Sequence, residues 1–326
     1  MLETMPQNSS AEGLADDRRS YHATSSPYPL PNDATEHARL DEQNAAYLAL
    51  MNNQLLHVPF SSSPSSRILD VGCGTGATTL QLAAAFPNAS AIGLDLSPVP
   101  ALQNVPSPNV CAVQGNFLDP TTLVVAARGH DGQGGKAGEE EEGEEGVIEK
   151  DGFDLVFSRL LVMGVDDWDG FYARVRDVLR PGGGAWVETQ DLDQVWYDGD
   201  GGGRRRISDG WPWLAALREA STRRGMDLEC ASKAAGRMRR AGLVDVRTQR
   251  FVLPLGEWAA HPEADAAARF ARRTLRACLQ GLLARMLRED GVPEASIAAL
   301  AADVLPDELW GVGVHRVLTV TCGRRP

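Results

Sequence analysis

The sequence lacks the features that would assign it to a membrane, secreted or metal-binding class. It contains no apolar run approaching about eighteen residues, so no membrane-spanning helix is expected. Its N-terminus shows neither the apolar stretch nor the cleavage pattern of a secretory signal. Five scattered cysteines form no C-x-x-C pair, which argues against a zinc ribbon or a disulfide framework. We therefore expect a reducing compartment, the cytoplasm, or the nucleus if the protein is regulatory. The six histidines show no metal-ligand spacing, so no metal is expected.

A basic field of the kind that binds nucleic acid is also missing. The 326 residues carry a net charge of −12, and residues 129–150 contribute half of it, with eight acids against two lysines. Like charges and glycines make this insert costly to order, so it is predicted to be a disordered acidic loop. A protein partner that binds through this loop is the functional alternative. Residues 1–27 are polar and aperiodic and are predicted to be a disordered tail.

Short apolar runs alternate with helical stretches from residue 67 onward. Apolar runs separated by helices are typical of a parallel sheet covered on both faces. The expected strands are 67–71, 89–94, 109–114, 153–157 and 184–190, and the expected helices are 76–86, 97–103, 119–127 and 166–180.

Segments on either side of this alternation are predicted to complete the domain. Asp33 has the character of an N-cap for an amphipathic helix over about 34–56. The other expected additions are an N-terminal helical cover (28–60), two late strands (243–253 and 311–322) and helical lid insertions (192–242 and 256–305). The sequence thus predicts one α/β domain over 28–326, with a Rossmann-like, doubly wound, mostly parallel seven-stranded sheet.

The segment ILDVGCGTG carries the clearest chemical signal. A strand ends at Asp70 and Val71, glycines follow at 72, 74 and 76, and a helix begins at once. Glycine suits a sharp turn that a ligand approaches closely, and the helix N-terminus offers free N–H groups. A nucleotide-type ligand is therefore expected over this turn, outside the carboxyl ends of the strands.

Two acidic residues bear on which nucleotide binds. Gly72, Gly74 and Ala77 also satisfy the dinucleotide pattern G-x-G-x-x-G/A, and Asp95 lies at the spacing of a ribose-binding acid in either case. Asp70, however, places a carboxylate inside the turn. A carboxylate there suits the cationic amino group and sulfonium of S-adenosylmethionine and opposes a pyrophosphate.

Together these segments resemble a known family. ILDVGCGTG (68–76) resembles motif I of class I S-adenosylmethionine-dependent methyltransferases, and LRPGGG resembles their turn before strand five. With LPNDATEHARLDEQ (30–43), IGLDLSPV (92–99), NFLD (116–119), FDLVFSRLLVMGVDDW (153–168) and LRPGGGAWVETQD (179–191), the chain is similar to the fungal secondary-metabolism methyltransferases. That group includes LaeA-type regulators and the thiol methyltransferase of gliotoxin biosynthesis.

The resemblance implies S-adenosyl-L-methionine as cofactor and a set of residues around it. Its methionine part would be lined by Asp70, Gly72, Gly74 and Gly76, and its ribose would be bound by Asp95. Its adenine would be contacted by Leu96, Asn116 and Phe117, and Ser158 and Arg159 would lie beneath its sulfonium. The N-terminal helix would cover the cofactor, with Arg39 near the cofactor carboxylate and Gln43 next to Arg39 on the same face of the helix. Arg39 has an alternative, because it can pair with Glu36 or Glu42 on its own helix.

The function that follows is methyl transfer to a small-molecule thiol, amine or hydroxyl by in-line displacement. No His/Asp pair stands at a convincing spacing, so no catalytic base is assigned; Glu188, Gln190 and Asp191 are the nearest candidates. Tryptophans 196, 211 and 213, with Tyr197, are expected near the acceptor site. Two alternatives stay open: a LaeA-like cofactor-binding regulator, and a protein of this fold that catalyses a step other than methyl transfer.

Overall fold

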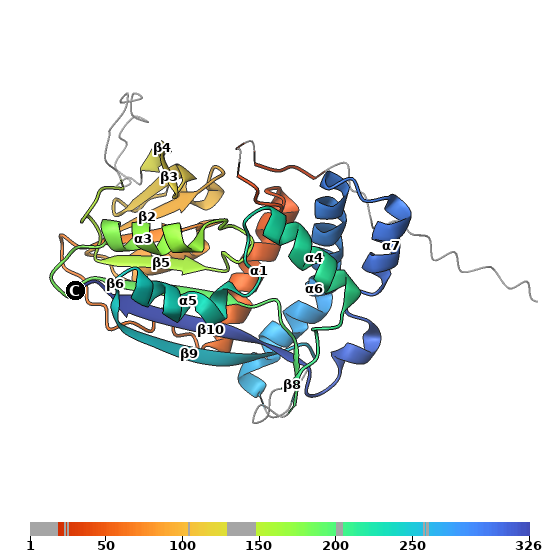
Figure 1. Ribbon diagram of the computed structural model, residues 1–326. Helices are drawn as coiled ribbons and strands as arrows, with labels where there is room; N and C mark the ends of the chain where they lie inside the picture. Colours follow the sequence, from red (N-terminus) through yellow and green to blue (C-terminus); the bar gives the residue numbers. More distant parts are fainter. Residues whose placement is uncertain are drawn as a thin grey trace, which may run out of the picture.

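The computed structural model describes residues 19–22, 24, 26–103, 105–128, 148–199, 205–256, 258 and 261–326. Its helices surround a ten-stranded sheet (Figure 1). The strands are β1 (Arg67–Val71), β2 (Ser90–Asp95), β3 (Val110–Asn116), β4 (Asp119–Arg128), β5 (Leu155–Arg159), β6 (Trp186–Leu192), β7 (Tyr197–Asp198), β8 (Arg205–Arg206), β9 (Val244–Pro254) and β10 (His315–Arg324). The α-helices are α1 (Ala34–Leu50), α2 (Ala77–Ala85), α3 (Trp168–Val178), α4 (Pro212–Arg223), α5 (Cys230–Arg240), α6 (Asp265–Glu289) and α7 (Glu294–Ala302), and the 3-10 helices are η1 (Pro100–Leu102), η2 (Pro262–Ala264) and η3 (Asp307–Trp310).

The sheet is doubly wound, as the sequence predicts. Its order is β4-β3-β2-β1-β5-β6-β10-β7-β8, with β9 paired to β10. The five strands from β3 to β6 in this order run parallel, and β10 is antiparallel to β6. Because β1 lies between β2 and β5, the chain reverses its direction of winding there. Ligands of open α/β sheets bind at such a switch point, beyond the carboxyl ends of the strands.

Alternate residues of each central strand enter two separate cores. Leu69 and Val156 pack with α3, α4 and α5 on one face of the sheet. Ile68 and Leu155 pack with α1, α2 and the first turns of α6 on the other. Helices α1, α4, α6 and α7 gather at one end of the sheet (Figure 1). The sheet therefore has a covered carboxyl end at which a closed site can form.

The helix expected over 119–127 is wrong, because this segment forms the edge strand β4. It pairs antiparallel with β3, and Val113 stands opposite Val125. The segment contains Thr121, Thr122 and Val124, and β-branched residues favour strands over helices. The seven expected strands are all present, and β4 with the two-residue strands β7 and β8 raises the number to ten.

Three expected helices have different limits. Helix α1 ends at Leu50 instead of about 56, because Asn52 and Asn53 adopt left-handed φ angles of 55° and 59°. The helix expected over 97–103 is reduced to the three-residue η1, which begins at a proline. The helical insertion expected over 256–305 is divided into α6 and α7, separated by Gly291 with a φ of 76°.

Part of the sequence predictions falls outside the described residues. The tail up to residue 18 and the acidic insert over 129–147 are among these. The described part of the expected tail includes Arg19, whose guanidinium pairs with Asp33 at 2.5 Å. Asp33 also caps α1 by accepting a hydrogen bond from the Glu36 N–H, which confirms the predicted N-cap. No helix in the described part of the chain is long and apolar enough to cross a membrane.

Candidate active site

A cavity of about 240 Å³ lies beyond the carboxyl ends of β1, β2 and β5. The turn after β1 forms its floor, α1 and Tyr28 form one side, and the segment after β5 forms another. Helix α6 and β10 close the far end. Of the twelve residues predicted from the sequence, the lining contains ten: Arg39, Gln43, Asp70, Gly72, Gly74, Asp95, Leu96, Asn116, Phe117 and Arg159.

The turn after β1 has the backbone that its glycines predict. Gly72, Gly74 and Gly76 have φ angles of 67°, 59° and 87°, which L side chains rarely adopt. The Gly72 and Cys73 N–H groups donate to the Leu94 carbonyl at 2.8 and 3.0 Å, which holds the turn against β2. A Cβ at Gly74 would meet nothing closer than Leu40 at 3.6 Å. The backbone at Gly74 is therefore exposed to the cavity and open to a ligand.

Asp95 stands at the end of β2 and ties the turn to the next loop. Its Oδ2 accepts from the Gly74 N–H at 2.9 Å, and its Oδ1 accepts from the Ser97 N–H at 3.0 Å. A carboxylate offers about four lone-pair positions, so both oxygens keep acceptor capacity for a ligand. Burial raises the pKa of Asp95 above its ordinary value. The geometry fits an acceptor of ribose hydroxyls that is itself held rigidly.

Asp70 lies beneath the same turn. Its Oδ2 accepts from the Thr79 hydroxyl at 2.7 Å. Burial raises the pKa of Asp70 to about 6, while the Thr79 bond and the positive charge of Arg159 oppose this shift. A buried carboxylate of this kind gains from a cationic ligand, because the ligand charge favours the ionised form.

Two arginines that line the cavity differ in their partners. Arg39 of α1 donates to Glu36 through Nε at 2.9 Å and through Nη2 at 2.5 Å, so the pairing open to it in the sequence is realised with Glu36. Burial lowers the pKa of Arg39, but this ion pair outweighs burial and raises it overall. The charge of Arg39 is thus largely neutralised before any ligand binds.

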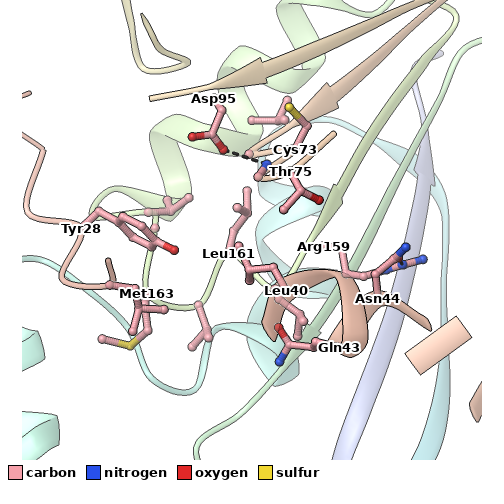
Figure 2. A pocket seen from close by; sticks show the side chains of 18 of the residues that line it. Tyr28, Leu40, Gln43, Asn44, Cys73, Thr75, Asp95, Arg159, Leu161 and Met163 are labelled. Carbon is pink, nitrogen blue, oxygen red and sulfur yellow. Dashed lines mark hydrogen bonds between the residues drawn. The ribbon is translucent and has the colours of Figure 1, made fainter. Parts of the chain in front are cut away.

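Arg159, at the end of β5, keeps a free donor. Its Nε donates to Gln190 at 2.7 Å, and its Nη1 donates to Asn44. Its Nη2 is buried and has no hydrogen-bond partner among the described residues. Burial lowers the pKa of Arg159 to about 10, against the opposing charges of Asp70 and Glu188. In Figure 2, Arg159 and Asn44 lie to the right of Leu161, and Asp95 lies above it.

The side of the cavity formed by β2 and β3 carries the residues expected around adenine. Leu96 and Asn116 line it, and the Asn116 side chain accepts from the Leu118 N–H at 2.9 Å. Phe117 is 5% exposed, and its ring lies 5.5 Å from that of Phe171. The Arg174 guanidinium sits 5.2 Å from the Phe117 ring centroid. Phe117 is therefore a fixed wall of the cavity.

Two predicted residues are absent from the described lining of the cavity. Gly76 begins α2, and a Cβ there would approach Leu102 to 2.7 Å and Val99 to 2.9 Å. Glycine is required at position 76 because a side chain there would not fit against Val99 and Leu102. Ser158 is 2% exposed and lies within β5, opposite Val71 and Thr189 of the neighbouring strands.

The suggested bases and the tryptophans are likewise absent from that lining. Glu188 accepts from the His57 and Val58 N–H groups at 2.6 and 3.0 Å, so it holds the segment after α1. Trp196 and Trp213 are 0% and 1% exposed, with ring centroids 5.5 Å apart. The tryptophan cluster forms, but as core.

Several lining residues were not identified from the sequence. They comprise Tyr28 before α1, Asn44 on α1, Thr75 in the turn, residues 160–165 after β5, and a group from the loop after β6, from α6 and from β10: Gln194, Phe270, Leu275, Cys278, Leu282 and Arg316. A signal existed for Arg316, since it alternates with Val314, Leu318 and Val320 and so shares their apolar face.

The sequence of this chain is similar to those of known methyltransferases. A family model described as a methyltransferase domain matches residues 69–185. Methyltransferase pytC of Aspergillus terreus is 28% identical over 295 residues, which cover 89% of this chain and 76% of that protein. The secondary metabolism regulator laeA of Aspergillus fumigatus is 26% identical over 317 residues, 94% of this chain and 75% of the regulator. Among solved structures, phosphoethanolamine N-methyltransferase 2 of Haemonchus contortus in complex with S-adenosyl-L-methionine has 16% identity and a TM-score of 0.46, covering 87% of this chain and 52% of that one.

The matched segment runs from β1 to the start of β6 and contains the turn, Asp95 and Arg159. With motif I intact at its start, the matched segment is a methyltransferase domain of the S-adenosylmethionine-dependent kind, and the chain as a whole is similar to a methyltransferase and to a secondary metabolism regulator of Aspergillus.

Proposed function

We propose that this protein transfers the methyl group of S-adenosylmethionine to a thiol, amine or hydroxyl of a small molecule by in-line displacement. The observation that carries the proposal is one cavity with two unlike ends. The glycine turn, Asp70 and Asp95 form a polar end, and apolar side chains of α6 form the other. Such a division suits a cofactor beside an acceptor.

The polar end is assigned residue by residue. Asp95 would accept hydrogen bonds from the ribose hydroxyls, and Asp70 would face the cationic amino group and sulfonium. Leu96, Asn116 and Phe117 would contact the adenine. Arg159 would bind the methionine carboxylate, because its buried Nη2 has no partner in the described chain, whereas Arg39 is already paired with Glu36.

The protein's contribution to the reaction would be positioning and exclusion of water. Bound S-adenosylmethionine supplies a methyl group on a sulfonium as the electrophile. The α6 wall would hold the acceptor in line with it, and most of the rate can come from this alignment in a dry site. A thiolate or neutral amine needs no base, whereas a hydroxyl needs its proton removed. Because Glu188, Gln190 and Asp191 are absent from the described lining, a thiolate or amine acceptor fits the cavity better than a hydroxyl.

Calorimetry with S-adenosylhomocysteine tests the cofactor site, with NAD as the parallel control. We expect micromolar binding of S-adenosylhomocysteine alone. A screen of thiols, amines and phenols with labelled S-adenosylmethionine then tests transfer. Binding of NAD instead, or of neither ligand, would refute the proposal.

A regulatory role is the second candidate, favoured by the similarity to laeA over 94% of this chain. The partner-binding segment suggested by the sequence is 129–150, most of which lies outside the described residues. Cofactor binding with no transfer to any acceptor, and a protein interaction lost on deleting this segment, would favour regulation.

A further inference from the structure

The far end of the cavity carries a buried cation that no carboxylate of the described chain neutralises. Arg316 of β10 is 4% exposed and belongs to the lining. Its Nη1 donates to the Gln194 side chain at 3.3 Å, and its Nε has no hydrogen-bond partner among the described residues. Its guanidinium lies 5.4 Å from the Trp196 ring centroid. Planar guanidinium groups with free donors bind oxyanions in a bidentate manner.

The other arginines of the cavity have charged partners. Arg39 is paired with Glu36, and Arg159 lies in the field of Asp70 and Glu188. Burial lowers the pKa of Arg316, and the groups that oppose this shift are Tyr47 and Cys278, neither of which is a carboxylate. The cofactor carries one carboxylate, for which Arg159 at the turn is the nearer candidate. The charge of Arg316 is thus left for another ligand.

Packing alone does not account for an arginine at this position. Arg316 shares the face of β10 with Leu318 and Val320, which enter the core beside Tyr47. A methionine or leucine would fill this space without desolvating a charge, and burying an ion costs several kcal/mol. The cation–π contact with the Trp196 ring offsets only part of this cost. An anionic ligand would supply the missing stabilisation.

We propose that Arg316 anchors an oxyanion, a carboxylate, of an otherwise apolar methyl acceptor. Phe270, Leu275, Leu279 and Leu282 of α6 form the apolar wall that would contact the body of this molecule. The inference rests on the proposed function and specifies its substrate class. Strand β10 runs antiparallel to β6, and Leu318 stands opposite Leu192, the last residue of β6. Arg316, two residues before Leu318, therefore lies just beyond the carboxyl end of β6, at the end of the cavity that would hold the acceptor.

The test uses carboxylates and their neutral amides on the full-length protein saturated with S-adenosylhomocysteine. Calorimetry compares 2-naphthoate with 2-naphthamide, and octanoate with octanamide. We expect at least one carboxylate to bind about tenfold more tightly than its amide. Arg316→Met should remove this preference and leave S-adenosylhomocysteine affinity unchanged. Arg276→Met is the matched control, because Arg276 lies 5.5 Å from the Trp310 ring but outside the described lining.

Each outcome decides the proposal. Equal binding of acid and amide by the wild type, or a preference that survives Arg316→Met, overturns it. Loss of S-adenosylhomocysteine affinity in this variant would assign Arg316 to the cofactor and also overturn it. If Arg316→Met fails to fold, Arg316→Lys serves, and an undiminished preference there counts against a bidentate anchor. If the wild type does not bind S-adenosylhomocysteine, the proposed function fails, whereas an Arg316-dependent preference in the free protein would still support the anion site.

Discussion

Replacing Asp95 with alanine tests the ribose assignment directly. Each Asp95 oxygen already accepts one backbone N–H bond, from Gly74 or Ser97, and each has capacity for a ribose hydroxyl. Hydrogen bonds to charged groups contribute about 1.5–3 kcal/mol each, and water that enters the vacated space recovers part of this. We expect a net loss of about 1–3 kcal/mol in S-adenosylhomocysteine binding, which is roughly 5- to 150-fold in affinity.

The control for Asp95→Ala is a carboxylate that has the same structural role elsewhere. Asp193 accepts from the Ala231 and Ser232 N–H groups at 3.0 and 3.1 Å, and burial raises its pKa as it does that of Asp95. It lies outside the described cavity lining. Asp193→Ala should therefore lower thermal stability about as much as Asp95→Ala does, and it should leave S-adenosylhomocysteine affinity unchanged.

Titration calorimetry and thermal melts on the two variants separate binding from folding. If Asp95→Ala binds S-adenosylhomocysteine within twofold of the wild type, the ribose assignment is refuted. If both variants lose affinity equally, the effect of Asp95 is one of general stability and the reasoning from its lone pairs fails.

Three further predictions concern the turn and its surroundings. The pKa of Asp70 is raised to about 6 in the free protein, so below this pH the Asp70 carboxyl must lose its proton before it can pair with the ligand ammonium. The affinity for S-adenosylmethionine should therefore rise by at most about tenfold per pH unit from about pH 5 to pH 7 and then level off, and calorimetry on Asp70→Asn should show no such dependence. Gly76→Ala should lose about 1–3 kcal/mol of stability in thermal melts, since its Cβ would clash with Leu102 and its φ is left-handed. Gly74→Ala shares the left-handed φ but has an open Cβ position, so it should lose less stability than Gly76→Ala and more cofactor affinity; the reverse pattern would contradict the cavity geometry. Arg159→Gln should weaken S-adenosylhomocysteine binding by about 10- to 100-fold but not that of methylthioadenosine, which lacks the amino-acid part; equal loss for both ligands would remove Arg159 from the carboxylate.

The sequence by itself determined the central sheet and the polar end of the cavity. Positive φ angles at Gly72, Gly74 and Gly76 are local demands of the turn, so the glycines could be read without knowing the fold. The position of Asp95 followed from the strand that ends there. These features depend on residues that are adjacent in the chain, so the order of residues is enough to predict them.

Elements with weaker local signals are predicted less accurately, in their type or in their limits. The alternation of strands and helices predicts a helix over 119–127. Instead, the β-branched residues of this segment favour a strand, and the segment pairs with the free edge of β3 as β4. The helix α1 was correctly expected, but its end depends on the left-handed Asn52 and Asn53.

Only the tertiary structure decided which charged groups are compensated. Arg39 has Glu36 three residues away, whereas Arg316 is brought from the last strand to the cavity and meets Gln194 and Trp196 there. Whether Arg316 is neutralised depends on side chains that are far away in the sequence, because the electrostatic energy depends on distance in space. Sequence alone therefore predicted most of the residues at the polar end of the cavity, while the end formed by α6 and β10 became visible only when the chain was folded.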